Sequence, residues 1–179
     1  MINPIDTLLN YLGDNLNIIF YKIGFTPNIL TTFSFLFGLL SMYYFYIDKR
    51  ILAAVLFIIN YFFDVMDGRF ARKYNMTSQF GDYYDHITDW IICIFIIIIM
   101  YIKNKYLLLK LTPLLLILLF LSLINLGCNQ KKRIKINEKS KTLKFTEKLC
   151  VNNTFSNITE FFDITFFSVV IFFVIIFFK

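Results

Sequence analysis

Long apolar runs divide this chain of 179 residues and limit what it can fold into. A helix needs about 20 apolar residues to cross a bilayer. Five runs of roughly that length are present, and the second carries a polar motif at its far end; their approximate bounds are 28–47, 51 onward, 84–102, 106–127 and 160–178. The sequence therefore predicts an all-α integral membrane protein, a bundle of five to six transmembrane helices.

The N-terminal residues are too polar to span a membrane, but they carry a helical pattern. In residues 5–22, leucine and isoleucine recur at helical spacing, while Asp6, Asp14 and Asn15 lie elsewhere on the helical wheel. This pattern predicts an amphipathic helix lying in the membrane interface; a poorly ordered tail is the alternative. The start of the chain lacks the basic residues and the leading apolar segment of a cleavable signal.

Charge gives the expected organisation and orientation. The polar segment 128–159 holds eight of the eighteen basic residues. Cytoplasmic loops carry an excess of Lys and Arg, so a cytoplasmic N-terminus fits, with twelve basic residues inside and five outside. We expect one membrane domain over 1–179, with a juxtamembrane helix at 1–26, four spans in 27–127, the polar loop, and a last span at 160–178. The net charge of +6 indicates contact with anionic lipid rather than nucleic acid.

Four carboxylates lie at helical spacing where the second apolar run ends and the third begins. Asp64 and Asp67 are three residues apart, and Asp85 and Asp89 are four apart, so each pair lies on one helix face. An ionisable group deep in a bilayer costs at least ~3 kcal/mol and usually marks function. Hard divalent cations suit such a cluster, and two of them could clamp a pyrophosphate. The structural alternative is ion pairing with basic neighbours, Arg69, Arg72 and Lys73.

The full spacing of this stretch is Asp64-x2-Asp67-Gly68-x2-Ala71-Arg72-x8-Gly81-x3-Asp85-x3-Asp89. It resembles the signature of the class-I CDP-alcohol phosphatidyltransferase family, and all eight fixed positions are present. The resemblance implies a membrane enzyme that moves a substituted phosphoryl group from a CDP-alcohol to an acceptor hydroxyl and releases CMP. It also implies six spans. The place of the fifth, 142–158, is too polar to cross lipid unaided.

The resemblance also implies roles for individual residues. Asp64, Asp67 and Asp85 would hold two divalent ions, Mg²⁺ or Mn²⁺, and Asp89 would act as the general base and as a further metal ligand. The residues expected to bind the substrate are Asn28, Thr31, Gly68, Ala71, Arg72, Ser78 and Gly81. Helix capping is the alternative for Asn28 and Thr31, and a simple loop position is the alternative for Ser78.

Other polar residues invite plainer interpretations. Asp82 lies outside the signature and is interpreted as a solvated loop charge, and His86 as a hydrogen-bonding group that orients Asp85 or Asp82. The run KKRIK at 131–135 is either a lipid-attracting loop or a site for a phosphate on the acceptor. The three cysteines, Cys93, Cys128 and Cys150, have no metal-ligand spacing and do not suggest a disulfide framework.

Several functions follow from this resemblance. The favoured one is phospholipid biosynthesis from CDP-diacylglycerol and a polar alcohol, with the active site facing the cytoplasm. The alternative donor is CDP-choline or CDP-ethanolamine, with diacylglycerol as the acceptor. An inactive family member is a further alternative, and a non-enzymatic divalent-cation binder or transporter is the alternative from outside the family. The expected partners are the two substrates, the lipid bilayer and, as an option, a second copy in a homodimer, but no nucleic acid.

Overall fold

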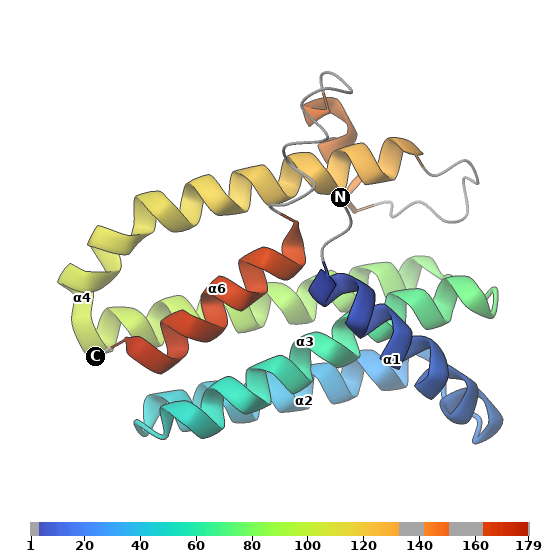
Figure 1. Cartoon of the computed structure of the whole chain (residues 1–179), viewed down its shortest axis with the longest axis horizontal. Helices are drawn as coiled ribbons and strands as arrows, with labels where there is room; N and C mark the ends of the chain where they lie inside the picture. Colours follow the sequence, from blue (N-terminus) through green and yellow to red (C-terminus); the bar gives the residue numbers. More distant parts are fainter. Residues whose placement is uncertain (1–3, 133–141, 151–162, 179) are drawn as a thin grey trace.

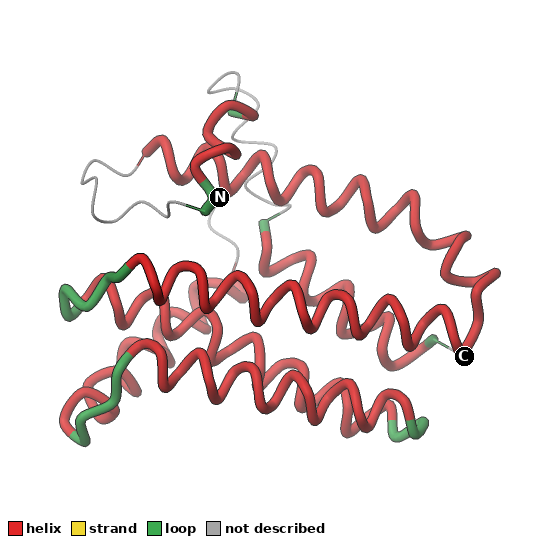
Figure 2. Tube along the Cα trace, turned by 180° about the vertical axis from the view of Figure 1, so that it is seen from behind, coloured by secondary structure: helices red, strands yellow, loops and turns green. Residues whose placement is uncertain are grey.

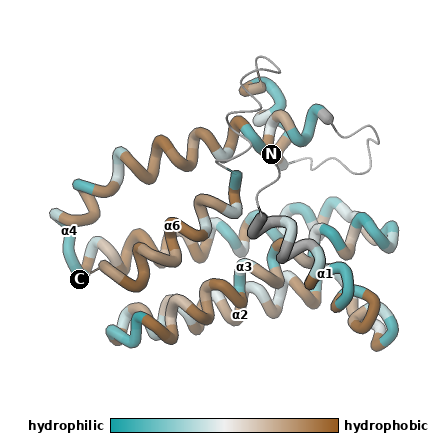
Figure 3. Tube along the Cα trace, viewed as in Figure 1, coloured by the Kyte–Doolittle hydropathy of each residue, from teal (hydrophilic) through white to brown (hydrophobic). Residues whose placement is uncertain are grey.

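The computed structural model describes residues 4–132, 142–150 and 163–178, and these residues form helices, turns and short connections without a strand (Figure 1). The prediction of an all-α protein is thus confirmed. Three helices, α2, α3 and α4, are long and apolar enough to cross a membrane. Figure 3 shows apolar residues along most of their length and polar residues gathered at the helix ends.

Helices α2 (Pro27–Tyr46) and α3 (Arg50–Lys73) form a hairpin. Ser34 and Asn60 join the two helices inside the apolar layer, because the Asn60 amide donates to the Ser34 carbonyl at 2.9 Å and the Ser34 hydroxyl donates to the Asn60 carbonyl at 3.0 Å. The Ser41 hydroxyl likewise donates to the Ala53 carbonyl at 2.8 Å. These buried bonds hold the helices close, which fixes how α3 presents its carboxylates.

Helix α4 (Gln79–Lys132) consists of two arms that meet at Asn104, where the backbone leaves helical geometry with φ −157° and ψ 87°. Figure 2 shows the second arm folding back from this bend. The break expected between the apolar runs 84–102 and 106–127 therefore coincides with this bend. The Nζ atom of Lys103 lies 2.7 Å from Oδ1 of Asp48, so the bend is fastened to the turn between α2 and α3.

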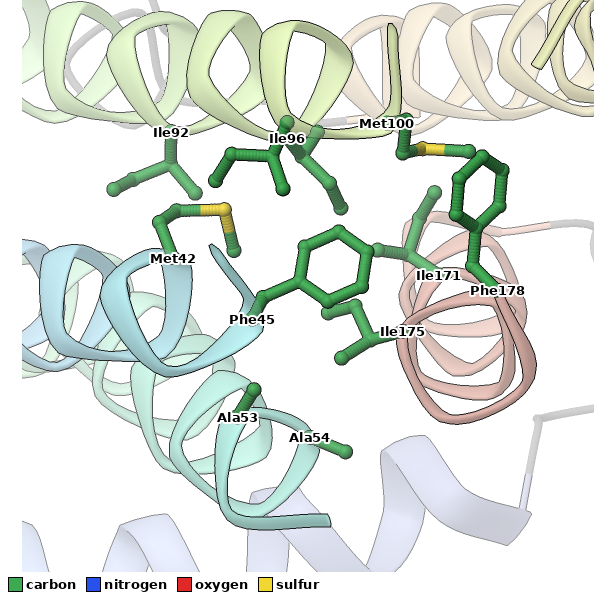
Figure 4. Close-up of a cluster of buried hydrophobic side chains, with 11 residues drawn as sticks. Met42, Phe45, Ala53, Ala54, Ile92, Ile96, Met100, Ile171, Ile175 and Phe178 are labelled. Atoms are coloured by element: carbon green, nitrogen blue, oxygen red, sulfur yellow. The ribbon is translucent and has the colours of Figure 1, made fainter. Parts of the chain in front are cut away.

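Helix α6 (Ile164–Phe177) is the described part of the expected last span, and Asp163 caps it by accepting a hydrogen bond from the Phe166 amide at 2.8 Å. Its apolar face packs into a core shared with α2, α3 and the first arm of α4 (Figure 4). Phe45 and Ile175 are fully buried there. This core lies near the bend of α4, because Nζ of Lys103 is 5.6 Å from the centre of the Phe45 ring, and polar residues gather at the opposite end of the helices (Figure 3).

The N-terminal helix α1 (Pro4–Lys22) exists as predicted and packs against α3. Oδ2 of Asp14 lies 2.7 Å from Nη2 of Arg69, and the Tyr21 ring stacks on the Tyr74 ring at 3.9 Å between centroids. Several apolar side chains of α1 face outward, including Ile19, which is 56% exposed. Outward apolar groups are what an interfacial helix offers to lipid.

A short 3-10 helix, η2 (Lys144–Leu149), packs against the second arm of α4. Cys150, which follows it, forms a disulfide with Cys128 of that arm, with 5.0 Å between the Cα atoms. The expectation of no disulfide was wrong. An odd number of cysteines and a spacing of 22 residues give no signal until the chain folds back on itself. The remainder of the place expected for a fifth span, 151–158, lies outside the described residues.

Candidate active site

The carboxylates of the motif converge from two helices. Asp64 and Asp67 lie on the last turns of α3, and Asp85 lies near the start of α4. One oxygen from each of these three carboxylates can be chosen so that all lie within 4.8 Å of one another. Like charges at this separation repel one another strongly in a water-poor site. The cluster therefore calls for a positive charge between its members.

Thr31 of α2 orients one of these carboxylates. Its hydroxyl hydrogen-bonds to Oδ2 of Asp67, and it also lies 3.2 Å from the Pro27 carbonyl in its own helix. Thr31 and Asp67 are 3% and 4% exposed, so this contact is buried. The structure thus places Thr31 as a support for Asp67 at the wall of the site.

One carboxylate oxygen of Asp85 is available to bind a cation. Its Oδ1 atom is buried and has no hydrogen-bond donor among the described residues. A buried carboxylate oxygen without a donor is costly, and a divalent cation with a preference for oxygen ligands would satisfy it. The donor set of Asp64, Asp67 and Asp85 therefore fits Mg²⁺ or Mn²⁺.

His86 lies beside the cluster without joining it. Its Nδ1 atom is 2.6 Å from the Asp82 carbonyl oxygen and 3.7 Å from Oδ2 of Asp85. The Asp82 carboxylate accepts two hydrogen bonds from Thr142, and its side chain is only 18% exposed. The interpretation of Asp82 as a solvated loop charge was therefore wrong, because residues 142–150 fold against it.

Asp89 is placed differently from the other three carboxylates. It lies one turn further along α4, where its carboxylate interacts with those of Asp64 and Asp85. It is not among the described residues that line the cavity. The three-carboxylate group that could hold a metal does not include it. Its expected roles as base and ligand stay predictions.

A cavity of about 920 Å³ opens in front of the cluster. Ligand pockets in proteins usually measure about 300–1,000 Å³, so this cavity is large enough for a small-molecule ligand. All seven residues expected to bind the substrate line it, together with the three clustered carboxylates. The seven are Asn28, Thr31, Gly68, Ala71, Arg72, Ser78 and Gly81.

Glycine at 81 and at 68 makes room for neighbouring side chains in this wall. A Cβ atom on Gly81 would lie 3.0 Å from both Asn28 Oδ1 and Ser78 Oγ. The Ser78 hydroxyl accepts a hydrogen bond from the Gly81 amide at 3.0 Å, which caps the start of α4. At Gly68 the Arg72 guanidinium folds across the backbone, 3.3 Å from the Cβ position. Ser78 thus occupies a loop position at the start of α4 and also lines the cavity, and its role in substrate binding stays a prediction.

The opposite wall of the cavity was missed from the sequence. It is built by the second arm of α4 and the start of α6, and it carries mainly amide and hydroxyl groups, with the helix-capping carboxylate of Asp163 beside them. Asn125 is 5% exposed, and its Oδ1 accepts a hydrogen bond from the Asn129 amide at 2.7 Å; the Tyr61 hydroxyl donates to the Thr165 hydroxyl at 2.8 Å. Two amides four residues apart in an apolar run were the available signal, because polar residues within spans usually face the bundle interior.

The comparison of sequences agrees with this geometry. The profile of the CDP-alcohol phosphatidyltransferase family matches residues 25–178, which is most of the chain. This chain belongs to that family. The matched range includes the carboxylate cluster, the cavity and α6. The family consists of transferases that act in membranes, and the long apolar helices of this chain agree with that setting.

Individual relatives match the chain over shorter stretches. Archaetidylinositol phosphate synthase from Pyrococcus horikoshii is 40% identical over 68 residues, which cover 38% of this chain and 36% of the relative. CDP-diacylglycerol–serine O-phosphatidyltransferase from Helicobacter pylori is 35% identical over 63 residues, or 35% of this chain and 27% of the relative. The chain thus spans about a third of the length of these curated relatives. No solved structure matches it significantly.

Proposed function

We propose that this protein is a divalent-metal-dependent CDP-alcohol phosphotransferase of phospholipid biosynthesis, with CDP-diacylglycerol as the favoured donor. The observation that carries the proposal is the group of three carboxylates within 4.8 Å at the wall of a 920 Å³ cavity. When bound, two Mg²⁺ or Mn²⁺ ions would offset the negative charge of the pyrophosphate and of the departing CMP. Family membership supports the same reaction class.

The residues near the α2–α3 and α3–α4 connections would hold the nucleotide. Arg72 supplies a cation for the phosphates, and glycine at 68 lets its guanidinium fold against the backbone at the edge of the cavity. Thr31 would hold Asp67 in one orientation while the substrate binds. Such fixed groups lower the barrier because they need no rearrangement as charge shifts.

The transfer itself joins the acceptor oxygen to the β-phosphorus. The bond between that phosphorus and the bridging oxygen breaks, and the bridging oxygen leaves with CMP. The acceptor hydroxyl loses its proton, and Asp89 is the proposed base that takes it. This assignment is supported by the family resemblance and by the position of Asp89 beside Asp64, one turn beyond Asp85. A positioned base typically contributes 10²–10⁴-fold.

The wall that faces the carboxylates is rich in amides and hydroxyls and supports a polar acceptor. Asn125 and Asn129 offer amide donors and acceptors, and Tyr61 and Thr165 offer hydroxyls. Diacylglycerol presents one hydroxyl on two long hydrocarbon chains and gains little from such a wall. We therefore favour CDP-diacylglycerol with a polar alcohol over CDP-choline or CDP-ethanolamine with diacylglycerol. The excess of basic residues at the carboxylate end supports an active site that faces the cytoplasm.

The decisive experiment is an assay of the purified protein with a panel of alcohols and CDP-diacylglycerol that carries a label in its CMP group. We expect CMP release that requires Mg²⁺ or Mn²⁺ and one of the polar alcohols. Asp85→Asn should abolish it, whereas Asp48→Asn, which changes a carboxylate at the other end of the helices, should retain it. Metal binding without CMP release from either class of donor would favour the non-enzymatic alternative.

A further inference from the structure

Residues 142–150, which we call the brace, connect the two arms of α4 near the cavity. One end of the brace lies against Asp82, in the first turn of the first arm. The other end lies against Cys128 and Lys131, in the last turns of the second arm. Leu143 of the brace lines the cavity itself.

The Asp82 end is held by hydrogen bonds. Oδ2 of Asp82 accepts from the Thr142 amide at 3.0 Å and from the Thr142 hydroxyl at 3.1 Å. The same hydroxyl lies 3.2 Å from Nδ1 of His86. Hydrogen bonds to an ionised acceptor are about twice as strong as those between neutral groups, so this is a firm attachment one turn before Asp85.

The second end is held covalently. The disulfide between Cys128 and Cys150 is supported by a hydrogen bond from Nζ of Lys131 to the Cys150 carbonyl at 2.7 Å. Between the two attachments, the Thr146 carbonyl lies so close to Gly127 that a Cβ there would be 2.0 Å from it. The brace therefore lies directly on the backbone of the second arm.

The bend at Asn104, where the chain passes from one arm of α4 to the other, is far from this region. Asn104 is 19 residues beyond Asp85, and a helix rises 1.5 Å per residue, which gives a separation of about 30 Å. A small rotation at such a distant bend would displace the cavity end of an arm by several ångströms. The brace is the described segment that ties the two arms together where the carboxylates face the amides of Asn125 and Asn129.

We propose that the brace sets the spacing between the cavity wall that carries the clustered carboxylates and the wall that carries Asn125 and Asn129. We propose also that Asp82 is a positioning residue for the reaction. This inference rests on the proposed function. Asp82 lies at the edge of the cavity but outside the group of three carboxylates, and we expect it to act through Thr142. Loss of the attachment should weaken use of the acceptor, which must contact both walls, more than it weakens binding of the donor, which lies along α2, α3 and the first turn of α4.

The kinetic test uses Thr142→Val, which removes the hydroxyl with little change in volume, and Thr142→Ser, which keeps it. We expect Thr142→Val to raise the KM for the acceptor about tenfold, as the loss of one hydrogen bond to a charged group implies. The KM for CDP-diacylglycerol and the metal dependence should stay within about twofold, and Thr142→Ser should restore the acceptor KM. The double variant Asp82→Ala/Thr142→Val should have the same KM for the acceptor as Asp82→Ala alone, because both changes break the same contact.

A second readout does not depend on activity. Leu143→Cys, in a Cys93→Ser background, places a thiol at the cavity, and its rate of reaction with a water-soluble maleimide reports how well the brace is seated. We expect Asp82→Ala, or Cys128→Ser combined with Cys150→Ser, to accelerate this labelling at least fivefold. Unchanged labelling in all of these variants would overturn the proposal, as would a loss of donor binding that matches the loss of acceptor use. A wild-type protein that transfers nothing would refute the proposed function, and the labelling would still decide the role of the brace.

Discussion

Thr31 of α2 donates a hydrogen bond to the Asp67 carboxylate of α3, so the wall of the site depends on a residue outside the carboxylate motif. Thr31→Val keeps the shape of the side chain and removes the donor. We expect the apparent affinity for Mg²⁺ in the transfer assay to fall about tenfold, as for a lost hydrogen bond to a charged group. Thr31→Ser should remain close to wild type; an unchanged metal titration in Thr31→Val would argue against a supporting role.

A substitution of Asp89 tests whether this residue acts as the general base or as a metal ligand. Because the three clustered carboxylates do not include Asp89, we expect Asp89→Asn to bind metal and CDP-diacylglycerol almost normally. Its kcat should fall by roughly 10²–10⁴-fold, the usual effect of removing a general base, with a smaller change in KM. The measurement is a metal titration of kcat. Recovery of near wild-type kcat at high Mg²⁺ would show that Asp89 serves as a ligand instead.

Gly127 should tolerate no side chain. A Cβ there would lie 2.0 Å from the Thr146 carbonyl, which is backbone and cannot swing away. We expect Gly127→Ala to lower the free energy of unfolding by about 1–3 kcal/mol, the usual cost of overpacking, seen as a lower melting temperature in detergent. Gly68→Ala is the matched control, because its nearest neighbour is the flexible end of Arg72. Equal melting temperatures for the two variants would contradict the close packing of the brace.

The orientation in the membrane can be tested from both faces. On a Cys93→Ser background, Thr77→Cys should react with an impermeant thiol reagent from the cytoplasmic face. Lys105→Cys should react from the opposite face, because twelve basic residues favour the first side and five the second. Labelling of Lys105→Cys from the cytoplasm would reverse the proposed topology.

Asp48 gives a pH-dependent contribution at the end of the helices remote from the cavity. A hydrogen bond from Lys103 lowers the pKa of Asp48, with a further contribution from Arg50. A lowered pKa stabilises the fold above the unfolded-state value, near 4, and this contribution is lost as the pH falls through the folded-state value. The advantage of wild type over Asp48→Asn in melting temperature should therefore be present at pH 6 and shrink towards pH 3. The effect should be small because the side chain is 64% exposed.

Asn is a suitable replacement at position 48. The backbone there has φ +63°, a left-handed conformation that Asn and Asp adopt more readily than most residues. Asp48→Asn thus removes the charge and leaves the turn intact. A difference in melting temperature that does not vary with pH would contradict the ion-pair explanation.

Local periodicity was enough to predict much of this fold. The apolar runs and the polar turns located α2, α3 and the two arms of α4, and the motif spacing brought Asp64, Asp67 and Asp85 together. These features depend on residues near one another in sequence or on two helices joined by one turn. Such information is present in the order of the residues before any tertiary contact forms.

The opposite wall could not be predicted in the same way. The contact of Tyr61 with Thr165 spans 104 residues, and that of Asp82 with Thr142 spans 60. No spacing rule connects such pairs, since they depend on where α6 and the brace come to rest. The same reason explains why Asp82 was interpreted as solvated and why the disulfide was missed.

The order of the helices along the chain has a consequence for biosynthesis. The clustered carboxylates are complete once residue 85 has been made, whereas the facing wall requires Thr165 near the other end of the chain. A nascent chain would thus hold three repelling acids together before the surrounding protein has formed. Early capture of a divalent ion would relieve this repulsion, so metal supply during translation should influence the yield of inserted protein as well as its later activity.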